Sequence, residues 1–254
     1  MITDNSILIS IVTPSYNCSD FIAQTIDSVK SQTYNNWEMI IVDDCSTDNS
    51  IDIINSYAKE DNRIKLYRLE KNSGAAVART KAIELAKGDY IAFLDSDDIW
   101  LPEKLQLQLE FMVKNNYHFT STKYSEMSHD GKDLRMLKVW EKTNYRQMLK
   151  SCRIGNSSVM YNCKALGKYK VPDIKRDNDF VLWLKIIKDT DYVYGLDKHL
   201  MKYRLTENSI SRKKSKKIKY HWLVFRQYEN LSFIYSLYLI FYWFFLKVFK
   251  VKYE

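Results

Sequence analysis

The chain has 254 residues, of which 46% are hydrophobic and 28% are charged. These values are typical of a globular protein, so they exclude a largely disordered chain and a polytopic membrane protein. The net charge of +8 lies entirely at one end: residues 208–254 hold ten Lys or Arg and two Glu, whereas residues 1–207 hold 29 residues of each sign. We therefore expect no nucleic-acid partner for the main body and an anionic partner for the C-terminal segment.

Cysteine usage and the first residues bear on the compartment. The four cysteines show no C-x-x-C pairing and no histidine at finger spacing, which predicts neither a zinc site nor a disulfide framework and favours a reducing cytoplasm. Asp4 precedes the first apolar run, without a basic leader or a small-residue cleavage site. We therefore expect no secretory signal.

Short apolar runs alternate with amphipathic stretches of helical length over the first hundred residues. The apolar runs occupy residues 7–12, 39–42, 64–69 and 90–94. The amphipathic stretches occupy residues 20–31, 49–59 and 74–87. Because strands that alternate with helices are joined by crossover connections, this order predicts a parallel sheet with both faces covered.

Beyond residue 100 the alternation changes. A helix is predicted over residues 103–114, and another over residues 178–188. Between them, extended runs at residues 117–123 and 136–139 flank the turn-like Asp130-Gly131, which predicts an antiparallel excursion rather than another crossover.

The C-terminal segment combines a basic cluster with an uncharged aromatic stretch. Six of the eight residues 212–219 are basic, and the sixteen residues 231–246 carry no charge and are half aromatic. Sixteen residues are fewer than the roughly twenty that a spanning helix needs, whereas aromatic and basic side chains favour the headgroup region of an anionic leaflet. We therefore expect a catalytic domain over residues 1–211 and a helical tail over residues 212–254 that lies on the membrane as a peripheral or monotopic anchor. The alternatives are a helix packed on the domain and a homodimer contact through the tail.

Acidic residues follow two of the predicted strands. Asp43 and Asp44 come after the second strand, and Asp95, Asp97 and Asp98 come after the fourth. Ligands of an open parallel sheet bind beyond the carboxyl ends of its strands, so these carboxylates are expected to converge. Because like charges raise one another's pKa, a divalent cation such as Mg2+ or Mn2+ would relieve the repulsion. No glycine-rich phosphate loop follows any strand, which leaves metal and side chains to hold a diphosphate.

Five segments occur in a characteristic order and spacing, namely ILISIVTPSYN, IIVDDCSTDNS, NSGAAVART, YIAFLDSDD and NDFVLWLKI. Together they resemble family 2 inverting glycosyltransferases, most of all those that build bacterial capsule, teichuronic acid or O-antigen. The resemblance covers residues 6–211 and implies the GT-A fold, an α/β fold with a central, mostly parallel, Rossmann-like sheet. It also implies transfer of a sugar from a nucleotide diphosphate, in our expectation UDP, to a hydroxyl of a glycan or lipid-linked acceptor at the cytoplasmic face of the cell membrane.

The resemblance implies roles for the residues of the first strand and its neighbours. Asp44 would read the nucleotide base, near the backbone of Pro14 and the ring of Tyr16. Arg79 would approach the nucleotide, since it stands where the family carries an A-R-N motif. The carboxylate of Asp179 would act as catalytic base, although Asn178 precedes it where the family more often has Glu or Gln.

The remaining roles concern the D-x-D region and the loop near residue 206. Asp95, Ser96 and Asp97 would contact the nucleotide sugar, and Asp97 and Asp98 would hold Mn2+ or Mg2+. Tyr203-Arg204 and Ser209-Ile210-Ser211 resemble the terminal Y-R and S-x-S pattern of the family. Thr206 stands where some members carry a His, so a metal ligand from that loop is left open.

Two other functions stay open on sequence grounds. A sugar-phosphate nucleotidyltransferase would use similar carboxylates but release pyrophosphate. A non-enzymatic protein could bind through its basic tail alone, yet such a protein would have no use for the carboxylate set that this chain retains. The sequence therefore favours the transferase, with a base on the acceptor hydroxyl and a metal at the diphosphate.

Overall fold

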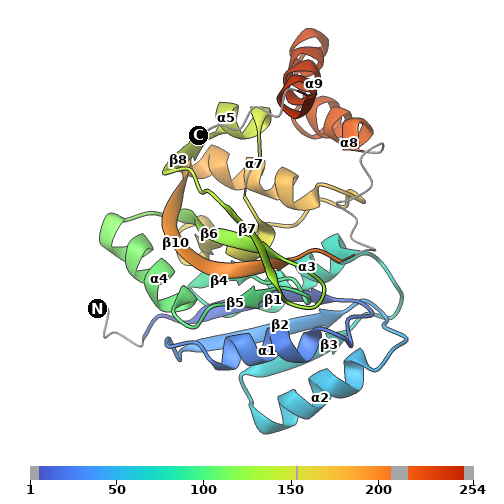
Figure 1. Ribbon diagram of the computed structural model, residues 1–254, viewed down its shortest axis with the longest axis vertical. Coiled ribbons are helices and arrows are strands. Elements are labelled where there is room, and N and C mark those ends of the chain that lie inside the picture. Colours follow the sequence, from blue (N-terminus) through green and yellow to red (C-terminus); the bar gives the residue numbers. More distant parts are fainter. Residues whose placement is uncertain (1–5, 153, 207–216, 249–254) are drawn as a thin grey trace.

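The structure is a computed structural model that describes residues 6–152, 154–206 and 217–248 (Figure 1). Its described residues form one ten-stranded sheet in the order β3-β2-β1-β4-β9-β6-β10-β5, with β7 paired to β6 and β8 paired to β10. The strands are β1 (Ile9–Ser15), β2 (Trp37–Asp43), β3 (Ile64–Arg68), β4 (Tyr90–Phe93), β5 (Ile99–Trp100), β6 (Phe119–Met127), β7 (Asp133–Leu137), β8 (Lys142–Asn144), β9 (Met160–Asn162) and β10 (Tyr192–Arg204).

Helices cover both faces of the sheet. They are α1 (Ile22–Lys30), α2 (Ser50–Glu60), α3 (Ala75–Leu85), α4 (Lys104–Asn115), α5 (Tyr145–Lys150), α6 (Cys163–Leu166), α7 (Asn178–Thr190), α8 (Lys217–Leu223) and α9 (Phe233–Val248), together with the 3-10 turn η1 (Asn156–Ser158) and the π-helical turn η4 (Val224–Tyr228). One core cluster joins α3 and α7 to one face, and the other joins α1, α2 and α4 to the opposite face. Successive residues of β1 divide between the clusters, since Ile11 belongs to one and Val12 to the other.

The first half of the sheet is parallel, as the alternating pattern predicts. β1 pairs in parallel with β2 and with β4, and β2 pairs in parallel with β3. Every residue of β1, β2 and β4 is buried, which agrees with the short apolar runs that mark these strands in the sequence. Ser15 lies opposite Asp43, so the loops after β1 and β2 begin at the same edge.

The second half of the sheet mixes directions. The predicted antiparallel excursion is confirmed by β6 and β7, and β9 runs antiparallel to both β4 and β6. β10 pairs in parallel with β6 and antiparallel with β5. This long strand, which the sequence pattern does not predict, brings its last residue, Arg204, beside the loop that follows β4.

The C-terminal helices pack against the body of the protein and form one end of the molecule, beyond α5 and α7 (Figure 1). Val224, Phe225 and Leu239 are fully buried in the same cluster as α7. The buried Glu229 carboxylate receives the Lys188 ammonium of α7 at 2.6 Å and the hydroxyl of Tyr145. The packed-helix alternative therefore describes one face of the tail. The predicted boundary at residues 211/212 lies outside the described residues, and none of the described helices has the length and hydropathy needed to cross a membrane.

Deletion of residues 212–254 is expected to lower the free energy of unfolding by several kcal/mol. Each fully buried apolar side chain contributes about 1.5–3 kcal/mol, and the deletion removes Val224, Phe225 and Leu239 from the core. Urea unfolding of the truncated and full-length chains measures the difference. The control is Ile234→Ser, because this side chain is 81% exposed and its loss should change stability by less than about 0.5 kcal/mol. Equal urea midpoints for the two chain lengths would contradict the packing described above.

Candidate active site

The loops after β1 and β2 form the first part of the site. The buried carboxylate of Asp44 joins β2 to the start of α3, since Oδ1 accepts from the Ser73 amide at 2.6 Å and Oδ2 from the Gly74 amide at 2.7 Å. Amides at a helix N-terminus stabilise a negative charge in this way. Pro14 lies buried at the end of β1, and Tyr16 leaves half of its surface exposed. The Asp44 amide donates to the carbonyl of the residue between those two at 2.8 Å, so the three residues predicted to bind the nucleobase are neighbours.

The loop after β4 carries the D-x-D residues, and they differ in environment. Asp98 is fully buried, and both its oxygens are paired inside the fold: Oδ1 accepts from the Arg204 amide at 2.9 Å and Oδ2 from a hydroxyl of η1 at 2.5 Å. Asp97 is partly exposed, and its pKa is raised to about 6 by burial and by the charge of Asp95. The Ser96 carbonyl accepts from a hydroxyl of α1 at 3.1 Å. Of the acidic residues here, Asp97 and Asp95 therefore keep surface toward solvent, whereas Asp98 lies within the fold.

Arg204 holds this loop in place from the end of β10. Its Nε donates to the Asp97 carbonyl, its Nη1 to the His129 carbonyl and its Nη2 to Gln24 Oε1, each at 2.8 Å. The guanidinium is buried and lies over the Phe21 ring, 4.7 Å from its centroid. A guanidinium offers five donors in a rigid plane, so one side chain fixes the D-x-D loop, α1 and the β6–β7 turn relative to one another. Sequence reasoning noted Arg204 only as part of a Y-R pattern and missed this role.

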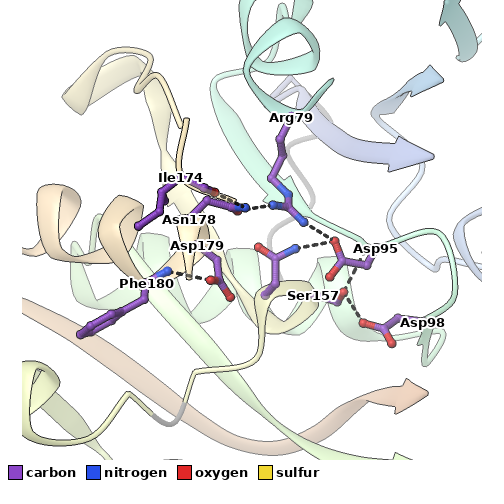
Figure 2. Close-up of polar contacts among 9 residues, drawn as sticks. Arg79, Asp95, Asp98, Ser157, Ile174, Asn178, Asp179 and Phe180 are labelled. Atoms are coloured by element: carbon purple, nitrogen blue, oxygen red, sulfur yellow. Dashed lines mark hydrogen bonds and ion pairs between the residues drawn. The ribbon is translucent and has the colours of Figure 1, made fainter. Parts of the chain in front are cut away.

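Arg79 connects the D-x-D loop to the start of α7 (Figure 2). Its Nη2 donates to Asp95 Oδ1 and its Nη1 to Asn178 Oδ1, both at 2.7 Å. Asp179, the next residue along α7, accepts from the Phe180 amide at 2.8 Å. Burial raises the pKa of Asp179, and the nearby Arg79 charge opposes that rise without cancelling it. The structure thus brings the predicted base and the predicted D-x-D residues to one place through a side chain of α3.

The turn η1 completes this place from a third direction. Asn156 Nδ2 donates to Asp95 Oδ1 at 2.8 Å, and the Ser157 hydroxyl accepts from the Asp95 amide at 2.9 Å while donating to Asp98. These two residues were not singled out from the sequence, because they lie outside the five segments that carry the family resemblance. Thr206 is partly exposed at the end of the second described range, and residues 209–211 of the S-x-S pattern lie outside the described residues.

A divalent metal fits the donor set of this site in part. Nowhere in the described ranges do three or more His, Cys, Asp or Glu side chains form a ready metal cluster. Mg2+ and Mn2+ sites in nucleotide enzymes need fewer protein ligands, since one or two carboxylates suffice when phosphates and water fill the remaining positions. Asp97, with its raised pKa beside Asp95, is a carboxylate that a cation would stabilise in the charged form.

Comparison with known proteins gives the family. The model of the family described as "Glycosyl transferase family 2" matches residues 10–173. The chain belongs to glycosyl transferase family 2. A similar relative is the putative teichuronic acid biosynthesis glycosyltransferase TuaG of Bacillus subtilis, 46% identical over 89% of this chain and 90% of that protein. Another is WfgD of Escherichia coli, a UDP-Glc:alpha-D-GlcNAc-diphosphoundecaprenol beta-1,3-glucosyltransferase, 39% identical over 91% of this chain and 90% of that protein.

Two solved structures share the fold described above. S. aureus TarS in complex with UDP-GlcNAc has a TM-score of 0.74 at 19% identity, over 93% of this chain and 71% of that one. The mannosyltransferase PcManGT of Pyrobaculum calidifontis, in complex with GDP-Man and Mn2+, has a TM-score of 0.64 at 15% identity, over 84% and 62%. The predicted GT-A fold and the predicted enzyme class are confirmed, so the chain is a glycosyltransferase rather than a nucleotidyltransferase or a non-enzymatic binding protein.

Proposed function

We propose that this glycosyltransferase is an inverting enzyme that moves a sugar from UDP to a hydroxyl of a lipid-linked glycan in the synthesis of a bacterial surface polysaccharide. The observation that carries the proposal is the bridge of Arg79 between Asp95 of the D-x-D loop and Asn178, the neighbour of Asp179. It sets a carboxylate of raised pKa beside the loop that would hold the donor. The acceptor class follows the diphosphoundecaprenol substrate named for the relative WfgD.

The nucleotide would bind at the loops after β1 and β2. The exposed ring of Tyr16 offers a stacking surface for a base, and Pro14 lies two residues before it, near the end of β1. Asp44 keeps lone pairs free although both its oxygens accept amides, so a base N–H could still bind there. A UDP-linked donor is supported by the UDP and UDP-GlcNAc complexes of the structural neighbour TarS.

Mn2+ or Mg2+ would bind at Asp97, with Asp95 Oδ2 as a second ligand, since Arg79 and Asn156 both use Oδ1 of Asp95. When bound, the cation supplies positive charge that stabilises the departing diphosphate. Asp98, which we expected to share the metal, has both oxygens engaged inside the fold. We propose that Asp98 shapes the loop instead of binding the ion.

Asp179 would take the proton from the acceptor hydroxyl as its oxygen attacks the anomeric carbon. The new glycosidic bond forms while the bond to the diphosphate oxygen breaks, and the single displacement inverts the anomeric configuration. Burial makes the Asp179 carboxylate a stronger base than a free aspartate, because it raises the pKa of the group. Arg79 would hold the catalytic base and the D-x-D loop in fixed positions relative to each other.

The reaction itself tests this proposal. The full-length chain, Mn2+ and a diphosphoundecaprenol-linked sugar acceptor are incubated with UDP-glucose, UDP-GlcNAc and GDP-mannose in turn, and the nucleotide product and the anomeric configuration are determined. We expect release of UDP and an inverted linkage with a UDP-sugar. Release of pyrophosphate, or retention of configuration, would refute the proposed mechanism.

We also propose that the enzyme works at the cytoplasmic face of the cell membrane, where the tail would lie on anionic lipid. α9 packs on the body through one side and turns seven large apolar side chains to solvent, namely Phe233, Ile234, Leu237, Tyr238, Phe241, Phe244 and Phe245. Basic residues accompany this aromatic face, since Lys150 of α5 lies over the Tyr242 ring, 5.5 Å from its centroid, and the basic cluster at residues 212–219 precedes α9 in the sequence. An apolar stripe flanked by cations suits the interface of an anionic bilayer.

The double substitution Phe241→Glu/Phe245→Glu is expected to lower binding to phosphatidylglycerol vesicles at least about tenfold, because each buried phenylalanine contributes up to about 3 kcal/mol. Co-sedimentation measures the binding, and phosphatidylcholine vesicles report the share due to charge. Tyr67→Glu serves as control, because this exposed ring lies on the edge strand β3, at the other end of the molecule from α9 (Figure 1). A wild-type dimer that the double substitution converts to monomer, without vesicle binding by either, would assign the aromatic face to a second copy.

A further inference from the structure

Two buried polar atoms at the site have no hydrogen-bond partner among the described residues. They are Oδ1 of Asn156, a residue only 9% exposed, and Nε of Arg79, a residue only 6% exposed. Buried polar groups in native proteins are nearly always paired, so an unpaired one calls for an explanation such as a ligand. Both side chains bind the same oxygen, Oδ1 of Asp95.

The orientation of the Asn156 amide follows from chemistry. Its nitrogen donates to the Asp95 carboxylate at 2.8 Å. A carboxylate accepts hydrogen bonds and donates none when ionised, so the flipped amide would set two acceptors against each other. The unpaired atom is therefore the carbonyl oxygen of the side chain, and the group that would pair with it must be a hydrogen-bond donor.

The turn that carries Asn156 is held firmly. The next residue, Ser157, binds both the Asp95 amide and the Asp98 carboxylate. The preceding residue, Gly155, packs so closely that an added Cβ would lie 3.1 Å from the Tyr124 ring. The amide of Asn156 is thus set in position before a ligand arrives, which favours binding because little further ordering is needed.

The position of Asn156 lies between the donor loop and the catalytic helix. Asp95 Oδ1 joins it to Arg79, which reaches Asn178 beside the proposed base. The proposed binding site for the nucleobase, at Asp44 and Tyr16, lies after two other strands, β1 and β2. A donor that spans from that site toward Asp179 would bring its sugar ring, rather than its nucleobase, past Asn156.

We propose that Asn156 binds the sugar ring of the donor, with Oδ1 accepting a hydrogen bond from a ring hydroxyl. This inference rests on the proposed function. A hydroxyl suits the site because it can donate to the amide oxygen, whereas a phosphate oxygen at neutral pH would be repelled by it. The contact makes Asn156 a specificity-determining residue, since a site built to bind a hydroxyl rejects a sugar that lacks it.

The test compares the affinities of the full-length chain for UDP, UDP-glucose and UDP-GlcNAc by calorimetry with Mn2+ present. In Asn156→Ala, we expect the affinity for the better UDP-sugar to fall about 10- to 100-fold more than the affinity for UDP. Ser157→Ala is the matched control, because it disturbs the backbone of Asp95 and leaves the Asn156 oxygen in place. That variant should change the affinities for UDP and the UDP-sugar by the same factor.

Deoxy analogues of the better UDP-sugar identify the hydroxyl. Removal of one hydroxyl should weaken binding to the wild type and leave binding to Asn156→Ala unchanged, because the partner is already absent. Equal losses of UDP and UDP-sugar affinity in Asn156→Ala would overturn the inference and reduce Asn156 to a support for Asp95. Failure of the wild type to bind UDP would instead refute the proposed function itself.

Discussion

Asp179→Asn is expected to lower the rate of sugar transfer by about 10²- to 10⁴-fold and to leave the affinity for the UDP-sugar unchanged. The substitution keeps the size of the side chain and removes its basicity, so the acceptor hydroxyl loses its proton acceptor in the transition state. Donor binding depends on the loops after β1, β2 and β4, which the substitution does not touch. Turnover with a lipid-linked acceptor and a separate donor titration measure the two quantities.

The control for Asp179→Asn is Asp173→Asn, an exposed acidic residue shortly before the same helix. Transfer by the wild type should also fall as the pH decreases through the raised pKa of Asp179, because the protonated form cannot accept a proton. This fall should begin at a higher pH than for an ordinary aspartate. Near-normal turnover in Asp179→Asn would mean that the base lies elsewhere.

Asp97→Ala is expected to abolish the part of UDP binding that depends on Mn2+ or Mg2+, and with it more than about 99% of the transfer activity. The carboxylate is the exposed ligand of the proposed metal site, and no other described carboxylate of the D-x-D loop except Asp95 reaches solvent. Titration of UDP with and without the cation measures the effect. Full wild-type activity in excess chelator would exclude the metal altogether.

The proposed metal site should also respond to pH. A ligating carboxylate must be ionised, and the pKa of Asp97 is raised to about 6 in the free protein, so metal affinity should decline as the pH falls below that value. The control substitution is Asp52→Asn on α2, because this acidic residue is exposed and belongs to another part of the fold. Its UDP binding and its chelator sensitivity should match those of the wild type.

The parallel half of the fold could be predicted from the sequence because strands buried on both faces are marked by short apolar runs. β1, β2 and β4 each contain such a run, and the acidic residues after β2 and β4 stand at the carboxyl ends of the strands, where such sheets bind ligands. The proximity of Asp95 and Asp179 was harder to predict from the sequence. It depends on Arg79, whose long side chain spans two elements far apart in sequence.

The other half of the sheet could not be predicted in the same way. β10 contains Gly195, Asp197 and Lys198, so neither alternation nor a continuous apolar run marks its thirteen residues as a strand. β9 has three residues, too few for any period. The hydrogen bonds of Arg204 and Asn156 join residues more than 60 positions apart, and a local pattern carries no information on such contacts.

The aromatic stretch of the tail supplies two surfaces of α9, one packed on the protein and one exposed to solvent. Its uncharged aromatic stretch predicted an apolar surface and gave no way to tell which side faces protein. In the structure Ser236 and Leu239 are fully buried, whereas Phe241 is 64% exposed. The ion pair between the buried Glu229 carboxylate and the half-exposed Lys188 of α7 ties the turn before α9 to the body.

The position of Arg204 has a consequence for how the enzyme is made. Strands β1 to β4 and the helices between them are complete within the first hundred residues, so they can begin to fold while the ribosome is still translating the rest. The loop that carries Asp97 receives its last support from an arginine synthesised 107 residues later. A nascent chain therefore holds its strands before it holds a finished donor loop, and sugar transfer can start only after β10 has left the ribosome and joined the sheet.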